Sequence, residues 1–136
     1  MLVKEVMTRD VEYVTNENTL QEAAEKMKEL DVGELPIAIG NEAVGVLTDR
    51  DIVIRSIAHG NDPKVAKVID AMTEGIIACY EDDKIEKAAK SMGKHRVRRL
   101  PVLNENGNIT GMISIGDLAS NLDNSLVGEV LMEISK

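Results

Sequence analysis

The chain has 136 residues, enough for one compact domain or for two very small ones that share a core. It contains no Trp and no Phe, so we expect a core of aliphatic side chains and methionine. A formal net charge of −8 and only two Tyr argue against a nucleic-acid-binding protein, which needs a basic surface or a base-stacking platform.

The compartment is indicated by what the chain lacks. No apolar run approaches the length of a membrane-spanning helix, and the first residues do not form a signal peptide. The single cysteine, Cys79, cannot form an intrachain disulfide, which fits a reducing compartment. We therefore predict a cytoplasmic protein without membrane attachment. Cys79 lies in an apolar stretch, and we expect it in the core rather than as a nucleophile.

The sequence is a tandem duplication. A shift of 65 residues places Met7-Thr8 on Met72-Thr73, and after one extra residue near Asn106 a shift of 66 places Asp51 on Asp117. Each copy reads as strand–helix–strand–strand–helix. The predicted fold class is therefore α+β, with two small sheets packed in pseudo-two-fold symmetry.

Each copy begins with an extended segment and a helix. The extended segments are predicted at 11–14 and 76–80. Thr19 and Glu22 form a capping box at the start of the first helix, and Asp83 precedes the second helix. Both helices must end before a Leu-Pro dipeptide, because proline cannot continue a helix.

A hairpin and a second helix complete each copy. Asn106-Gly107 is a strong tight-turn signal, and Gly40-Asn41 is a weaker one. The predicted hairpin strands are 36–39 with 43–47 and 101–103 with 109–114, and the helices that follow span 49–58 and 115–122.

The repeats and their boundaries follow from these elements. We predict a first repeat at 1–60, a linker at 61–64, a second repeat at 65–122 and a C-terminal helix at 123–136. About sixty residues bury too little surface to be comfortable alone, so the two repeats should form one compact module. The tail places Leu126, Val130, Leu131 and Ile134 on one helical face, which would close the core or form a dimer interface.

The turns at Thr48 and Ser114 are the candidate functional motif. Each follows a Gly-containing strand, and an aspartate stands three residues after the hydroxyl residue. Thr48 with Asp51, and Ser114 with Asp117, could simply cap their own helices. Alternatively, the exposed N–H groups and the carboxylate could bind an anionic, hydroxyl-rich ligand. Repetition of the arrangement favours a shared site.

These motifs together resemble the CBS-domain pair, or Bateman module, over nearly the whole chain. The resemblance rests on Val6-Met7-Thr8 and Asp70-Ala71-Met72-Thr73, the Ala-Ala-x-x-Met helices, the Leu-Pro strands and the two turns. It implies a regulatory binding module and not an enzyme. Members of this family bind AMP, ADP, ATP or S-adenosylmethionine in the cleft between repeats, and they often form homodimers. The resemblance implies no cofactor apart from this regulatory ligand. It also implies that the partner could be a target enzyme or a transporter.

The resemblance also implies two sets of ligand-binding residues. In the family the turn aspartate holds the ribose hydroxyls, and backbone and aliphatic groups of the other repeat grip the base. On that pattern, the first site comprises Thr48, Asp51, Thr73, Ile77, Val97, Arg98 and Arg99. The second site comprises Thr8, Glu12, Val32, Glu34, Ser114 and Asp117.

Charge distinguishes the two sites. Arg99 aligns with Glu34, and the stretch from Lys87 to Asn104 carries six cations and no acid. Arginine suits phosphate geometry, whereas a carboxylate repels phosphate. We therefore predict phosphate binding at the site with Arg99 and a weak or empty second site. Alternatively, the cations form a solvated helix end.

Two other functions are compatible with the sequence. The module could be a ligand-free dimeric scaffold whose turns are only caps. It could bind RNA or DNA through the patch from Lys87 to Arg99, although the net charge weighs against this. His59 and His95 show no metal-ligand spacing, so we predict no metal site.

Overall fold

The computed structural model describes residues 1–136 and divides into two compact units. Unit 1 comprises 1–11 and 77–136, and unit 2 comprises 12–76. The units therefore cut across the repeats along the chain: the segment that begins each repeat belongs to the unit built mainly from the other repeat. The predicted α+β class with two small sheets is confirmed.

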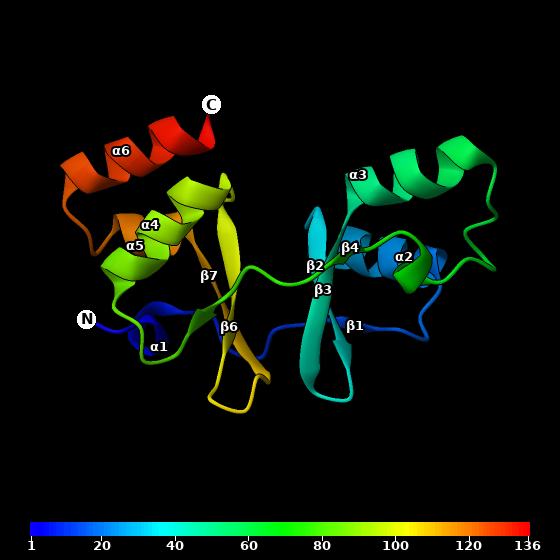
Figure 1. Cartoon of the computed structure of the whole chain (residues 1–136), viewed down its shortest axis with the longest axis horizontal. Helices are drawn as coiled ribbons and strands as arrows, with labels where there is room; N and C mark the ends of the chain where they lie inside the picture. The colour runs from blue at the N-terminus through cyan, green and yellow to red at the C-terminus, as the bar shows by residue number, and fades with distance from the viewer. The chain divides into compact units, whose positions relative to one another are not determined.

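Unit 2 is a four-stranded sheet with helical segments (Figure 1). Its strands β1 (Val14–Thr15), β2 (Glu34–Ile39), β3 (Glu42–Thr48) and β4 (Thr73–Glu74) lie in the order β1-β2-β3-β4. Strand β1 runs parallel to β2, and the other two pairs are antiparallel. The helical segments are α2 (Leu20–Leu30), α3 (Asp49–Asp51), η1 (Ile52–Ser56), η2 (Ile57–His59) and η3 (Val68–Asp70).

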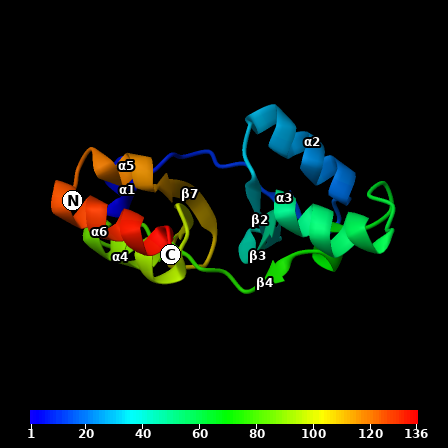
Figure 2. The ribbon, with the colours of Figure 1, turned by 90° about the horizontal axis from the view of Figure 1, so that it is seen from above.

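Unit 1 repeats this plan with one extra helix. Its sheet has the order β5-β6-β7, formed by β5 (Cys79–Tyr80), β6 (Arg99–Leu103) and β7 (Ile109–Ser114). Its helices are α1 (Val3–Val6), α4 (Ile85–His95), α5 (Ile115–Ala119) and α6 (Asn124–Ile134). Figure 2 shows α6 lying along α4. Helix α6 has no counterpart in unit 2.

The core of each unit is aliphatic, as the composition predicts. In unit 2, Leu20, Ile37 and Leu47 are fully buried in one cluster. In unit 1, Ile85, Met92, Leu100, Ile113 and Leu118 form the equivalent cluster. None of the helices is both long enough and apolar enough to cross a bilayer.

The predicted start of the first long helix is confirmed. Thr19 Oγ1 accepts from Glu22 N at 3.1 Å, and Glu22 Oε1 accepts from Thr19 N at 2.9 Å. These bonds lower the pKa of the Glu22 carboxyl. The matching helix α4 begins after Lys84, whose side chain makes no capping bond, and Asp83 instead accepts from Tyr80 N.

Four predicted elements, two extended segments and two helices, differ in detail. The extended segments form strands of only two residues, β1 and β5. The helix predicted at 49–58 is a single α-turn followed by the π-helical segment η1 and the 3₁₀ segment η2. Its sequence Ile52-Val53-Ile54 is β-branched throughout, which disfavours a regular α-helix. The helix predicted at 115–122 ends at Ala119.

The C-terminal helix closes the core of unit 1. Val130 is buried, and Leu126 and Ile134 pack against the same cluster. Helix α6 packs on α4 at Gly93, where an added Cβ would lie at an ordinary van der Waals distance, 3.7 Å, from the Cα atom of Val130. Leu131, however, is 38% exposed, so the buried apolar face of the helix is narrower than the sequence predicts.

In each unit, a glycine in the second strand of the hairpin allows close contact with the segment that comes from the other repeat. In unit 2, Thr73 pairs with Val46, and a Cβ on Gly45 would lie 2.6 Å from Thr73 O. In unit 1, Thr8 pairs with Met112, and a Cβ on Gly111 would lie 2.8 Å from Thr8 O. Only glycine allows these backbones to approach so closely.

We expect Gly111→Ala to lower the free energy of unfolding by about 1–3 kcal/mol, because the added methyl group must displace a backbone segment. Gly128→Ala is the control: no atom lies within 4 Å of its added Cβ, and the residue is inside helix α6. That control should be unchanged or about 0.5–1 kcal/mol more stable. Urea unfolding curves measure both. Equal stabilities for Gly111→Ala and wild type would contradict the close approach.

Candidate functional site

Both candidate turns form reciprocal hydrogen bonds. In unit 2, Thr48 Oγ1 accepts from Asp51 N at 3.0 Å, and Asp51 Oδ2 accepts from Thr48 N at 3.0 Å. In unit 1, Ser114 Oγ accepts from Asp117 N at 3.1 Å, and Asp117 Oδ2 accepts from Ser114 N at 2.9 Å. The capping interpretation is therefore confirmed for both turns.

Capping leaves one oxygen of each carboxylate without a capping hydrogen bond. A carboxylate has two oxygens and about four acceptor positions, and the capping bond occupies only one of them. Asp51 is 8% exposed, and its Oδ1 lies 3.6 Å from Nε of Arg55. Asp117 is half-buried and forms no ion pair. The second carboxylate oxygen of Asp51 thus faces a cation, and that of Asp117 does not.

Arg55 makes the two turns unequal. Besides facing Asp51, it donates from Nη1 to the carbonyl oxygen of Met72 at 3.1 Å, and so links the turn to the segment that enters β4. The aligned residue in unit 1 is Asn121, whose Nδ2 donates to the backbone oxygen of Asp117 at 3.2 Å. A cation therefore partly neutralises the Asp51 carboxylate only.

The structure groups part of the first predicted residue set in unit 2. Thr48 and Asp51 share a turn, and Thr73 pairs with Val46 on the neighbouring strand. The other members of this set, Ile77, Val97, Arg98 and Arg99, belong to unit 1. Of these, Ile77 is 41% exposed and Val97 packs against the core of unit 1.

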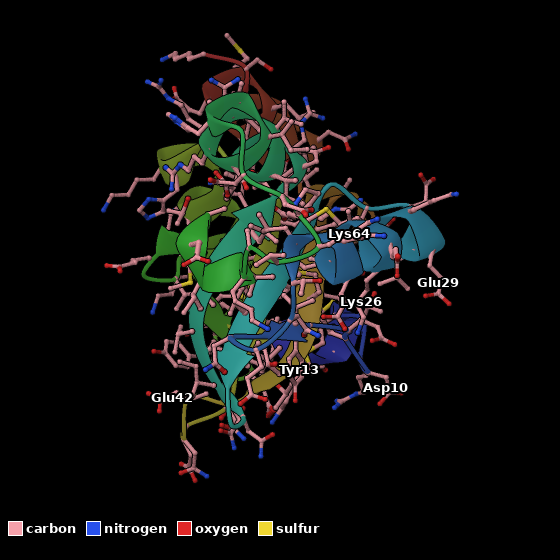
Figure 3. The ribbon with its side chains drawn as sticks, turned by 90° about the vertical axis from the view of Figure 1, so that its right-hand side faces the viewer. Asp10, Tyr13, Lys26, Glu29, Glu42 and Lys64 are labelled. Atoms are coloured by element: carbon pink, nitrogen blue, oxygen red, sulfur yellow. The ribbon has the colours of Figure 1, made fainter.

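The second predicted set is likewise divided. Unit 1 contains Ser114, Asp117 and Thr8, whose backbone forms reciprocal hydrogen bonds of 2.9 Å with Met112. Unit 2 contains Glu12, Val32 and Glu34. Glu12 accepts from Lys26 Nζ at 2.9 Å, and Figure 3 shows Lys26 directed toward Tyr13, whose carbonyl oxygen also accepts from it.

The register of each hairpin places a charged residue opposite the hydroxyl residue of the turn. In unit 1, Arg99 stands opposite Ser114, and the carbonyl oxygen of Arg98 accepts from Ile115 N at 2.9 Å. In unit 2, Glu34 stands opposite Thr48. Residues opposite each other in antiparallel strands are neighbours on one face of the sheet. Each turn therefore has its own cross-strand charge, positive at Ser114 and negative at Thr48.

The remaining reactive groups form no alternative site. Cys79 is buried, and burial raises the pKa of its thiol from 9.0 to about 12, with the Asp83 charge acting in the same direction. No group of three or more His, Cys, Asp or Glu side chains is placed to hold a metal ion.

Replacing either hydroxyl residue by alanine, as Thr48→Ala or Ser114→Ala, should lower the free energy of unfolding by about 0.5–2 kcal/mol. The N–H group of the aspartate would lose its acceptor. Asparagine keeps an acceptor at an N-cap, so Ser114→Asn is the matched control and should lose less stability. Chemical denaturation measures all three. An alanine variant as stable as wild type would contradict the capping role.

Cys79 should resist thiol reagents in the folded protein. Because the pKa of its thiol is about 12 instead of 9.0, the fraction of Cys79 present as thiolate at about pH 8 is about a thousand-fold lower than for an exposed cysteine. Ellman's reagent should therefore react slowly with native protein and rapidly in urea. Rapid reaction without urea would show that Cys79 is accessible and ionised.

Comparison with known proteins identifies the family. The family model described as "CBS domain" matches residues 3–57 and 65–124. The chain is 39% identical over 137 residues to the uncharacterized protein YlbB of Bacillus subtilis, covering 98% of this chain and 91% of YlbB. It is 35% identical over 120 residues to Hypoxic response protein 1 of Mycobacterium tuberculosis, covering 88% of this chain and 83% of that protein.

A solved structure shows the same fold. The crystal structure of Hypoxic Response Protein I with two coordinated zinc ions has a TM-score of 0.81 and 34% identity, and the match covers 90% of this chain and 100% of that chain. The family match spans both sequence repeats and most of the chain. This protein therefore belongs to the CBS-domain family and contains two CBS domains.

Proposed function

We propose that the chain is a regulatory module, rather than an enzyme, that binds an adenosine-containing ligand. The observation that carries this proposal is the pair of turns at Thr48–Asp51 and Ser114–Asp117. Both have the same hydrogen-bonded geometry, in a chain of the CBS-domain family. Many combinations of residues can cap a helix. The presence of the same hydroxyl–aspartate pair in both turns therefore favours a role in ligand binding for both.

The chemistry of the turns supports a nucleoside ligand. A ribose presents two neighbouring hydroxyl groups, and an ionised carboxylate accepts from such donors through charge-assisted hydrogen bonds. The capping bonds hold the Asp51 and Asp117 side chains in one orientation before any ligand arrives. Preorganisation of this kind reduces the entropy lost on binding.

One structural neighbour guides the choice of ligand. CBSX2, solved in complex with AMP, matches with a TM-score of 0.71 over 99% of this chain. Its identity is 23%, so the match establishes a common fold and leaves AMP as a candidate ligand. ADP, ATP and S-adenosylmethionine share the adenosine group and are the other candidates.

Arg99 is the proposed contact for a phosphate group. It is exposed, and none of the ion pairs of the structure involves it. We propose that it acts with Thr48 and Asp51, as the family resemblance implies. Its cross-strand position opposite Ser114 makes the Asp117 turn the competing assignment. The two aspartates can be tested separately.

Calorimetric titration of AMP, ADP, ATP, S-adenosylmethionine and adenosine tests the proposal. Arg99→Ala should weaken binding of the phosphorylated ligands by about ten- to a hundred-fold and leave adenosine unchanged, because one charge-assisted hydrogen bond is worth about 1.5–3 kcal/mol. Equal loss for adenosine would contradict a phosphate contact.

Replacing each turn aspartate by asparagine identifies which of the two binds the ligand. Asp51→Asn should weaken nucleotide binding by about ten-fold or more, and Asp117→Asn should have a smaller effect. The opposite ranking would assign the ligand to the Asp117 turn. If both variants change only stability and wild type binds none of the ligands, the turns are caps and the chain is a ligand-free scaffold.

A further inference from the structure

Arg55 lies between two parts of the candidate site in unit 2. Its Nε atom is 3.6 Å from Oδ1 of Asp51, and its Nη1 group donates to the carbonyl oxygen of Met72 at 3.1 Å. Met72 directly precedes Thr73, which pairs with Val46 on β3. One side chain of unit 2 therefore connects the Asp51 turn with the segment of Thr73, and both belong to the first predicted residue set.

Most of the Arg55 guanidinium has no partner in the protein. Arginine has five N–H donors, and the bond to Met72 uses one of them. The contact with Asp51, at 3.6 Å, is too long for a hydrogen bond, and Nη2 donates to no group of the chain. The side chain is 52% exposed. A guanidinium that is anchored at one nitrogen and open to solvent at the others is suited to bind an oxyanion in a defined orientation.

A phosphate group at this turn requires a cation. Besides Asp51, the strand residue Glu34 stands opposite Thr48, so two carboxylates adjoin the turn. Both repel a phosphate group, which carries nearly two negative charges at neutral pH. Arg55 is the cation paired with Asp51, whereas none of the ion pairs involves Arg50, which stands beside Asp51 in the sequence. Without Arg55, the turn would favour an uncharged or cationic ligand.

The other turn has its cation on a different element. The residue aligned with Arg55 is Asn121, a neutral side chain that donates to the backbone oxygen of Asp117 at 3.2 Å. The cation of that turn is Arg99, which stands opposite Ser114 on the neighbouring strand β6. The Asp51 turn therefore has a cation within its own unit, independent of Arg99.

We propose that Arg55 sets the charge specificity of the Asp51 turn: its guanidinium binds the phosphate group of a nucleotide whose ribose hydroxyls bind Asp51. This inference rests on the proposed function and deepens it, because it names a nucleoside phosphate as the ligand class of this turn. Adenosine has no phosphate, and S-adenosylmethionine has a cationic sulfonium group in its place. Neither ligand gains the contact between Arg55 and a phosphate.

Calorimetric titration of the full chain with AMP and with adenosine tests the proposal. Arg55→Gln should weaken AMP binding by about ten- to a hundred-fold and leave adenosine within about two-fold, because one charge-assisted hydrogen bond to phosphate is lost. Arg55→Lys keeps the charge without the planar fork and should lose less affinity for AMP. Arg50→Gln makes the same charge change at an exposed arginine beside Asp51, and its ratio of AMP to adenosine affinity should equal that of wild type.

The ratio of the two affinities separates recognition from structural support. If Arg55 served only to link the turn to Met72, its replacement would weaken AMP and adenosine equally, and the proposal would be overturned. Equal AMP binding by Arg55→Gln and wild type would overturn it as well. A selective loss of AMP with Arg99→Ala alone would assign the phosphate to Arg99.

Failure of the proposed function gives a different result. Wild type that binds neither AMP nor adenosine overturns both proposals, whereas wild type that binds both ligands with no selective loss in Arg55→Gln overturns only the role of Arg55. Thermal unfolding verifies that each variant is folded. Should Arg55→Gln unfold, the smaller loss expected of Arg55→Lys, again confined to AMP, tests the same contact.

Discussion

The close approach of a Met-Thr segment to a strand glycine is the contact on which both units depend. Thr73 O lies 2.6 Å from the position of a Cβ on Gly45, and Thr8 O lies 2.8 Å from that of a Cβ on Gly111. The segment thereby adds to the edge of the hairpin, a few residues before the turn that carries the aspartate. Because each segment comes from the beginning of the other repeat, the chain crosses between units twice. Each unit therefore contains a segment of both repeats, and the two units are joined by two connections of the chain.

In the proposed function, the same atoms of each turn serve structure and binding. The hydroxyl oxygen and one carboxylate oxygen satisfy backbone N–H groups at the helix start, which would otherwise lack partners. The second carboxylate oxygen is then held in place at little further entropic cost. Arg55 modifies this arrangement in unit 2 only, where it faces Asp51 and binds the carbonyl oxygen of Met72. Duplicated turns can thus acquire different affinities without a change in backbone.

Local signals in the sequence predict local structure well. The capping boxes at Thr19, Thr48 and Ser114 involve residues three apart, and the Asn106-Gly107 turn needs only two residues, so each can be recognised without knowing the fold. The family resemblance rests on the same signals, and the family match confirms it.

Relations over longer distances could not be predicted in this way. A repeat of 65 residues does not reveal which hairpin receives the segment containing Met7, because the two hairpins offer the same glycine. Motif alignment pairs Arg99 with Glu34 but does not tell which turn either residue adjoins. That depends on strand register, which places Arg99 opposite Ser114. The π-helical segment at Ile52 also has no simple sequence signal, since β-branched residues weaken an α-helix without specifying its replacement.

The central claim is that the capped turns bind an adenosine-containing ligand. Backbone amide NMR spectra recorded during an AMP titration test it most directly, because each turn residue is observed separately. If the turns bind the ligand, the resonances of the Thr48 to Asp51 amides should shift saturably, while those of the Asn106-Gly107 turn stay in place. Unchanged amides in both turns at saturating AMP, ATP and S-adenosylmethionine would contradict it.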